Sequence, residues 1–256
     1  MQTVRTGPAI GFLAQFVLLA GLGETAGLGG AGWLVGLTYG AALCGLLTWG
    51  MHRSGALHLG PADWVTLTRA VLVGGVAALT ADSFDQPVPV RLLVILTIVA
   101  LVLDGVDGQV ARRTGTVSAL GARFDMEVDA SLLLVLSLHA AHQVGAWVLA
   151  IGLMRYVFVV ATWLLPWMQA TLPPRYWRKV VAATQGVVLV SASAGVIALP
   201  LMVAALMIAL ALLVESFGRD VVWLWARRVP KVRRHVVEDQ WPVEQFPAGR
   251  SAPIAP

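Results

Sequence analysis

Acidic residues gather in one short stretch of the chain. Five of the fourteen lie between positions 104 and 129, namely Asp104, Asp107, Asp125, Glu127 and Asp129. The first two are three residues apart, and Asp125 and Asp129 are four apart, so each pair shares one face if its segment is helical. On two adjacent antiparallel helices these four carboxylates would converge and repel one another unless cations neutralised them. Because all-oxygen ligation suits Mg²⁺, Mn²⁺ or Ca²⁺, the spacing predicts a divalent-metal site.

The residues between the two acidic pairs suit phosphate chemistry. Gly108 and Gly121 remove side chains where a ligand or a neighbouring helix must approach closely. Arg112, four residues after Gly108, can grip a phosphate with two donors. We therefore expect metal-bridged displacement at phosphorus, in which a spare carboxylate deprotonates an incoming hydroxyl. The alternative, solvated charges in an interfacial loop, fits Glu127, Arg113 and Arg123 better than the four aspartates.

The elements that carry these residues belong to a very apolar chain. Of its 256 residues, 58% are hydrophobic and 12% are charged, whereas a soluble domain has about a quarter charged residues. This composition excludes an ordinary cytosolic enzyme, a disordered tail and a nucleic-acid-binding domain. The single cysteine, Cys44, excludes an internal disulfide framework and a multi-thiolate metal site. We predict an all-α polytopic membrane protein.

Gaps between charged residues locate the membrane spans. A helix that crosses the bilayer needs about 20 mostly apolar residues. The uncharged stretch 180–214 is long enough for two helices, with Pro200 as the natural break. We predict eight spans, at residues 8–23, 31–51, 62–81, 88–107, 121–142, 146–167, 178–198 and 201–225.

The basic residues indicate the orientation of these spans. Lys and Arg gather after the second, fourth and sixth spans and in the C-terminal tail, whereas the opposite connections contain none. Basic connections stay in the cytoplasm, so we expect both termini and the acidic cluster to be cytoplasmic in the plasma (inner) membrane. The first apolar run, from Ala9 to Leu22, could also be a signal peptide, and we favour a retained helix.

Two segments match the pattern of a known family. The longer reads Asp104-Gly-Val-Asp107-Gly108-Gln-Val-Ala111-Arg112, then eight residues, Gly121, three residues, Asp125, three residues and Asp129. It resembles the CDP-alcohol phosphotransferase signature at every fixed position. The shorter reads Asp63-Trp-Val-Thr66-Leu-Thr-Arg69. It resembles the family's Asn-x-x-Thr-x-x-Arg element, with Asp63 in place of Asn. Eight specified residues at fixed spacing in a membrane protein make this resemblance far more specific than a lone glycine motif.

The resemblance implies a six-helix transmembrane core over residues 61–225 that binds two divalent cations, Mg²⁺ or Mn²⁺. Four residues match the family's metal ligands, namely Asp104, Asp107, Asp125 and Asp129. Asp129 also matches the general base. Positions that match contacts to the CDP group are Asp63, Thr66, Gly108, Arg112 and Ser118. The implied reaction transfers a phosphatidyl group from CDP-diacylglycerol to an alcohol and releases CMP, while the diacyl tails stay in the lipid bilayer.

The acceptor alcohol has no signature in this sequence. After the last aspartate, many phosphatidylglycerophosphate synthases carry Lys and many inositol-phosphate synthases carry Arg, whereas this chain has Ala130. Candidates for binding an anionic acceptor are Arg155, which interrupts an uncharged span, and Arg178 and Lys179, which also read as topology anchors. Asp63 lacks the amide donors of Asn, although its carboxylate could accept from cytosine.

The resemblance also divides the chain. Residues 1–60 would be an N-terminal transmembrane hairpin added to the core, and 226–256 a basic, then Pro-containing cytoplasmic tail without fixed structure. Expected partners are CDP-diacylglycerol, an alcohol and the bilayer, with a homodimer left open and no nucleic acid.

Three alternatives compete with this function. They are a phosphotransferase that uses a soluble CDP-alcohol and a lipid acceptor, a divalent-cation transporter, and a non-catalytic scaffold. The clustering of the acidic residues at one face of the membrane argues against a transporter, whose acidic residues would line a path across it. The intact set of four aspartates argues against a scaffold.

Overall fold

The computed structural model describes residues 6–228 apart from 57, 116–117, 171 and 174, and the regular structure in these residues is helical. The helices are α1 (Thr6–Ala26), α2 (Gly30–Ser54), α3 (Pro61–Asp82), α4 (Val90–Thr114), α5 (Ala119–Val144), α6 (Leu149–Leu164), α7 (Tyr176–Ala194) and α8 (Leu199–Ala226). Two 3₁₀ turns, η2 (Ala146–Val148) and η3 (Pro166–Gln169), flank α6. The predicted all-α fold is confirmed, and each predicted span has its helix. Most of the predicted tail lies outside the described residues.

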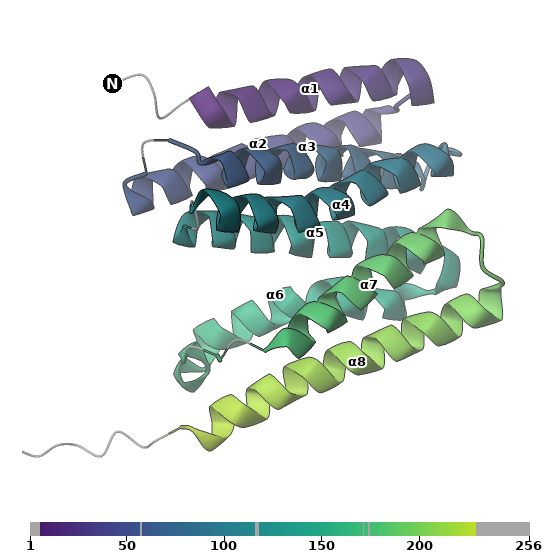
Figure 1. Ribbon diagram of the computed structural model, residues 1–256. Coiled ribbons are helices and arrows are strands. Elements are labelled where there is room, and N and C mark those ends of the chain that lie inside the picture. Colours follow the sequence, from purple (N-terminus) through teal and green to yellow (C-terminus); the bar gives the residue numbers. More distant parts are fainter. Residues whose placement is uncertain (1–5, 57, 116–117, 171, 174, 229–256) are drawn as a thin grey trace, which may run out of the picture.

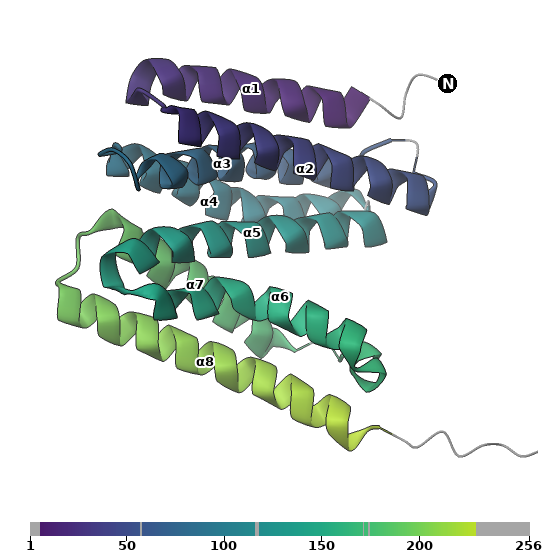
Figure 2. The same ribbon diagram turned by 180° about the vertical axis from the view of Figure 1, so that it is seen from behind.

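Successive helices run in opposite directions, so their ends gather at two sides of the bundle (Figures 1 and 2). The end of α2, the start of α3, the end of α4 and the start of α5 lie on one side, at the left in Figure 1. Helix α3 packs against α1, α2, α4 and α5, while α5 continues the contacts to α6 and α7. Contacts between the N-terminal helices (α1 to α4) and the C-terminal helices (α6 to α8) therefore depend mainly on α3 and α5.

Among the described residues, five helical segments are long and apolar enough to cross a membrane. They are α1, α2, α3, the segment Ala146–Leu164 and α8. Helices α4, α5 and α7 are not among them; the acidic cluster lies on α4 and α5, and Arg178 and Lys179 lie at the start of α7. The chain is an all-α polytopic membrane protein, and the crossing of these three helices stays a prediction.

The helix ends differ from the predicted spans where local chemistry decides them. Helix α4 continues to Thr114, beyond the apolar run that ends near 107, so Gly108 lies inside a helix. Helix α7 ends at Ala194 because Gly195 adopts a left-handed backbone with φ 64°. Pro200 lies in the first turn of α8, where a missing N–H costs nothing.

Helix α2 packs closely because glycines line its inner face. Gly32, Gly36 and Gly40 are buried and spaced four residues apart. A Cβ atom on Gly36 would lie 2.6 Å from Leu19 of α1 and 3.2 Å from Ala78 of α3. Small residues let helix backbones approach in this way inside a membrane.

The N-terminal end of α2 is held by a carboxylate at the C-terminal end of α3. Asp82 is 2% exposed and accepts hydrogen bonds from the backbone N–H groups of Gly29 (2.5 Å) and Gly32 (2.6 Å). The first N–H groups of a helix have no partner within the helix, and a carboxylate placed there accepts hydrogen bonds from them. Its negative charge also interacts favourably with the positive end of the helix dipole. This contact fixes the N-terminal hairpin to α3.

Replacing Asp82 with Ala should therefore lower the free energy of unfolding by about 2 kcal/mol, since it leaves two buried N–H groups unpaired. Thermal unfolding in detergent would measure the effect. Asp85→Ala is the matched control, because Asp85 is exposed three residues further on. Equal melting temperatures for the two variants would contradict this role of Asp82.

Candidate metal centre

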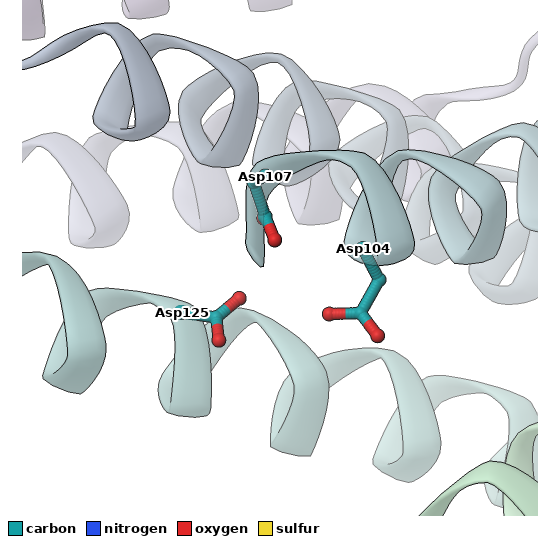
Figure 3. A group of neighbouring side chains, drawn as sticks. All are labelled: Asp104, Asp107 and Asp125. Atoms are coloured by element: carbon teal, nitrogen blue, oxygen red, sulfur yellow. The ribbon is translucent and has the colours of Figure 1, made fainter. Parts of the chain in front are cut away.

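Helices α4 and α5 bring acidic side chains from two parts of the sequence together. Asp104 and Asp107 project from α4 and Asp125 projects from α5 towards them (Figure 3). Each offers one carboxylate oxygen, and these oxygens all lie within 4.8 Å of one another. The i, i+3 spacing on α4 places both of its aspartates on the face that meets α5. The structure thus brings three of the four predicted ligands directly together.

The fourth aspartate joins the group through Arg69, to which the sequence analysis assigned no role in the site. The guanidinium of Arg69, on α3, donates to Asp107 and Asp125, each at 2.5 Å, and lies 2.9 Å from Asp104. It also donates to Asp129. Arg69 is 1% exposed. One buried cation therefore contacts all four carboxylates and cannot by itself balance their charge.

The sequence contained a signal for Arg69. It is the only charged residue between Asp63 and Asp82, in the middle of an apolar helix. A charge in such a place needs a partner, so it is a functional candidate by default. The shorter matched segment ends at Arg69. Arg69 lies 35 to 60 positions before the aspartates, so local spacing in the sequence could not predict their contact.

Thr66, one turn before Arg69, also adjoins the cluster. Its hydroxyl oxygen lies 3.2 Å from a carboxylate oxygen of Asp107 and 3.2 Å from the carbonyl oxygen of Ala62. Thr66 is 3% exposed. The hydroxyl has one proton to donate, so it can serve either acceptor in turn.

Asp63 and Ser118 hold the helix starts at this side of the bundle. A carboxylate oxygen of Asp63 accepts from the N–H of Gly60 at 2.8 Å, at the start of α3. The Ser118 hydroxyl accepts from the N–H of Gly121 at 2.8 Å and caps α5. A Cβ on Gly121 would lie 2.4 Å from the other Asp63 oxygen, so glycine lets α5 begin beside α3. These local contacts explain three of the residues in the two matched segments.

The remaining predicted donor-binding positions lie on the last turns of α4. Gly108 is half-buried and directly follows Asp107. Arg112 belongs to the same helix, but its side chain lies outside the part of the structure that is described.

Two of the three predicted acceptor-binding residues, Arg155 and Arg178, have carboxylate partners. Arg155 of α6 pairs with Glu127 of α5 at 2.6 Å. Arg178 lies 3.5 Å from the buried Asp220 of α8 and donates to the carbonyl of Pro173. Lys179 is exposed on the first turn of α7. Glu127, expected to be a solvated charge, is exposed and also joins α5 to α6 through Arg155.

Comparison with protein families identifies the class to which this fold and site belong. Residues 60–217 match the family described as CDP-alcohol phosphatidyltransferase. The match covers more than half of the chain, so the chain belongs to this family, and the predicted resemblance is confirmed. Comparisons with curated proteins and with solved structures gave no match. The family consists of divalent-metal-dependent transferases of phosphate-containing groups that use CDP-alcohol substrates in a lipid bilayer.

The residues present suit a divalent cation. The cluster offers carboxylate oxygens from two helices, which are hard ligands of the kind that Mg²⁺ and Mn²⁺ prefer. Its negative charge exceeds that of the single guanidinium, so a further cation would be attracted to it.

Replacing Arg69 with Gln should destabilise the protein in chelator by about 3 kcal/mol, because the carboxylates lose their buried partner. Mg²⁺ should then raise the melting temperature of Arg69→Gln more than that of the wild type. Thermal unfolding with EDTA and with Mg²⁺ measures both effects. Arg91→Gln, at an exposed position on the far end of α4, should behave as the wild type. If Arg69→Gln melted like the wild type in EDTA, the organising role of Arg69 would be wrong.

Proposed function

We propose that this protein is a phosphatidyltransferase that moves a phosphatidyl group from CDP-diacylglycerol to the hydroxyl of an alcohol and releases CMP. The observation that carries this proposal is the convergence of aspartates from α4 and α5 around Arg69, within the segment that matches the family. A diacyl donor fits a site on helices of a membrane protein, because its tails can stay in lipid while its pyrophosphate meets charged residues.

Asp104, Asp107, Asp125 and Asp129 would hold the metal ions, two Mg²⁺ or Mn²⁺. Such ions neutralise the pyrophosphate of the donor and make its phosphorus easier to attack. Asp107 is the most enclosed of these carboxylates, with 7% of its side chain exposed, and Arg69 behind it keeps the ligands in place. The protein's own contribution is therefore a fixed set of oxygens where α3, α4 and α5 meet.

Asp129 is the residue that we assign as general base. Its side chain is 45% exposed, so an alcohol arriving from water can reach it. In the proposed step the carboxylate takes the proton of the acceptor hydroxyl, whose oxygen forms a bond to the phosphorus that carries the diacylglycerol. The bond from this phosphorus to the CMP oxygen breaks, and CMP leaves with the electron pair.

Asp63, Thr66, Gly108, Arg112 and Ser118 are proposed to line the donor's CDP group. Thr66 is favoured by its place beside Asp107, and Gly108 by its place one residue further along α4. Asp63 and Ser118 also cap helices, so any contact to the nucleotide would use their remaining acceptor capacity.

For the acceptor we retain Arg155, Arg178 and Lys179 as candidates for an anionic group. Arg155 and Arg178 already have carboxylate partners, so an acceptor phosphate would have to compete with Glu127 or Asp220. Lys179 is exposed on the first turn of α7. We propose that the side of the bundle where α4 ends and α5 begins, and both termini, face the cytoplasm of the plasma (inner) membrane, with residues 1–60 preceding the catalytic core 61–225.

The test of this function is CMP release by purified protein supplied with CDP-diacylglycerol, Mg²⁺ and a panel of acceptors. The panel includes glycerol 3-phosphate, inositol 1-phosphate, inositol, serine and phosphatidylglycerol. Release with one acceptor is expected to fall at least about 100-fold in Asp129→Asn, because the base is lost. Glu127→Gln, on the same helix but directed to α6, should retain transfer at saturating acceptor. CMP release from a soluble CDP-alcohol with a lipid acceptor, and none from CDP-diacylglycerol, would contradict the proposed donor.

Removal of metal gives a second test. Excess EDTA should abolish CMP release, and added Mg²⁺ or Mn²⁺ should restore it, because the carboxylates alone repel the donor's pyrophosphate. The rate of CMP release before and after dialysis measures this dependence. Full turnover in chelator would reject the proposed metal centre.

A further inference from the structure

A tyrosine of α2 reaches the turn of α5 that carries Asp129. The phenolic oxygen of Tyr39 lies 3.0 Å from the hydroxyl oxygen of Ser131, two residues after Asp129. Helix α2 precedes residues 60–217, the segment that matches the family. This contact therefore comes from a part of the chain that the family pattern does not cover.

The direction of the hydrogen bond follows from the partners of Ser131. Its hydroxyl donates to the carbonyl of Val128 at 2.8 Å and so uses its only proton. Tyr39 must then be the donor to Ser131. The resulting chain runs from Tyr39 through Ser131 to Val128, and it spans the turn that holds Asp129.

Helix α2 is a firm support for this contact. Asp82 holds its first turn, and its buried glycines lie against α1 and α3. Near its other end, a Cβ on Gly50 would lie 2.6 Å from Leu120, the second residue of α5. A shift of α2 along or around its axis would therefore break the hydrogen bonds to Asp82, the glycine contacts with α1 and α3, the contact with Leu120 and the bond to Ser131.

Tyr39 packs against the hydrophobic core, which makes its bond to Ser131 specific. A hydroxyl without a partner is costly in such surroundings, so the pair favours one register of α2 against α5. Rotation of the α5 turn would move Ser131 away from Tyr39 and, with it, Asp129 away from Arg69.

We propose that Tyr39 is a positioning residue of the metal centre: by donating to Ser131 it fixes the turn of α5 that presents Asp129. The N-terminal hairpin is then part of the support of the active site. The inference rests on the proposed function, because it takes Asp129 to be a metal ligand.

The test compares Mn²⁺ affinity among purified variants, measured from the electron paramagnetic resonance signal of free Mn²⁺ well below the unfolding temperature. Tyr39→Phe and Ser131→Ala should each weaken Mn²⁺ binding about five-fold, the effect of one hydrogen bond. The double variant should be no weaker than either single variant, because both changes remove the same contact. Tyr176→Phe, at a tyrosine that is 81% exposed on α7, is the matched control and should bind as the wild type.

Three results would overturn the inference, and they are distinguishable. Wild-type affinity in Tyr39→Phe or, should that variant not fold, in Ser131→Ala would remove the positioning role and leave the proposed function intact. Losses that multiply in the double variant would mean that the two residues act independently. Failure of the wild type to bind Mn²⁺ would overturn the proposed function and this inference together.

Discussion

A positive charge buried in the middle of an apolar helix has to be matched, and Arg69 of α3 is matched by carboxylates from α4 and α5. An unpaired ion in such surroundings costs several kcal/mol, so this one requirement fixes how the three helices meet. Helices α4 and α5 must present their acidic faces to α3 at the same depth. The remaining helices then pack around a centre whose geometry is already set.

This arrangement also explains why the same residues can serve stability and chemistry. Arg69 contacts each aspartate but cannot balance them all, so the folded protein keeps an excess of negative charge where α3, α4 and α5 meet. In the proposed function this negative charge would attract divalent cations and, through them, the phosphates of a CDP-linked donor. The local contacts of Asp63 and Ser118 bring the starts of α3 and α5 to the same end. In this account fold and function depend on the same ionic contacts.

Sequence alone predicted what depends on local spacing. The uncharged runs marked most helix ends to within a few residues, although α4 continues to Thr114, beyond its predicted end at 107. The paired aspartates indicated two helix faces that converge. Contacts between segments that are distant in the sequence could not be predicted in this way. Arg69 meets Asp129 sixty residues away, and Tyr39 meets Ser131 across 92 residues. Pairings such as Arg155 with Glu127 are equally invisible, because a charge near a helix end has the same pattern whether it faces lipid head groups, a ligand or another helix.

The central claim is that the carboxylates around Arg69 form a centre for two metal ions, and counting bound Mn²⁺ tests it most directly. Equilibrium binding to purified protein, with CDP-diacylglycerol present, is predicted to saturate at two ions per chain. Asp107→Asn should lose at least one of them, since Asp107 is the most enclosed of the four carboxylates. Saturation below one ion per chain, or an unchanged count in Asp107→Asn, would contradict the account.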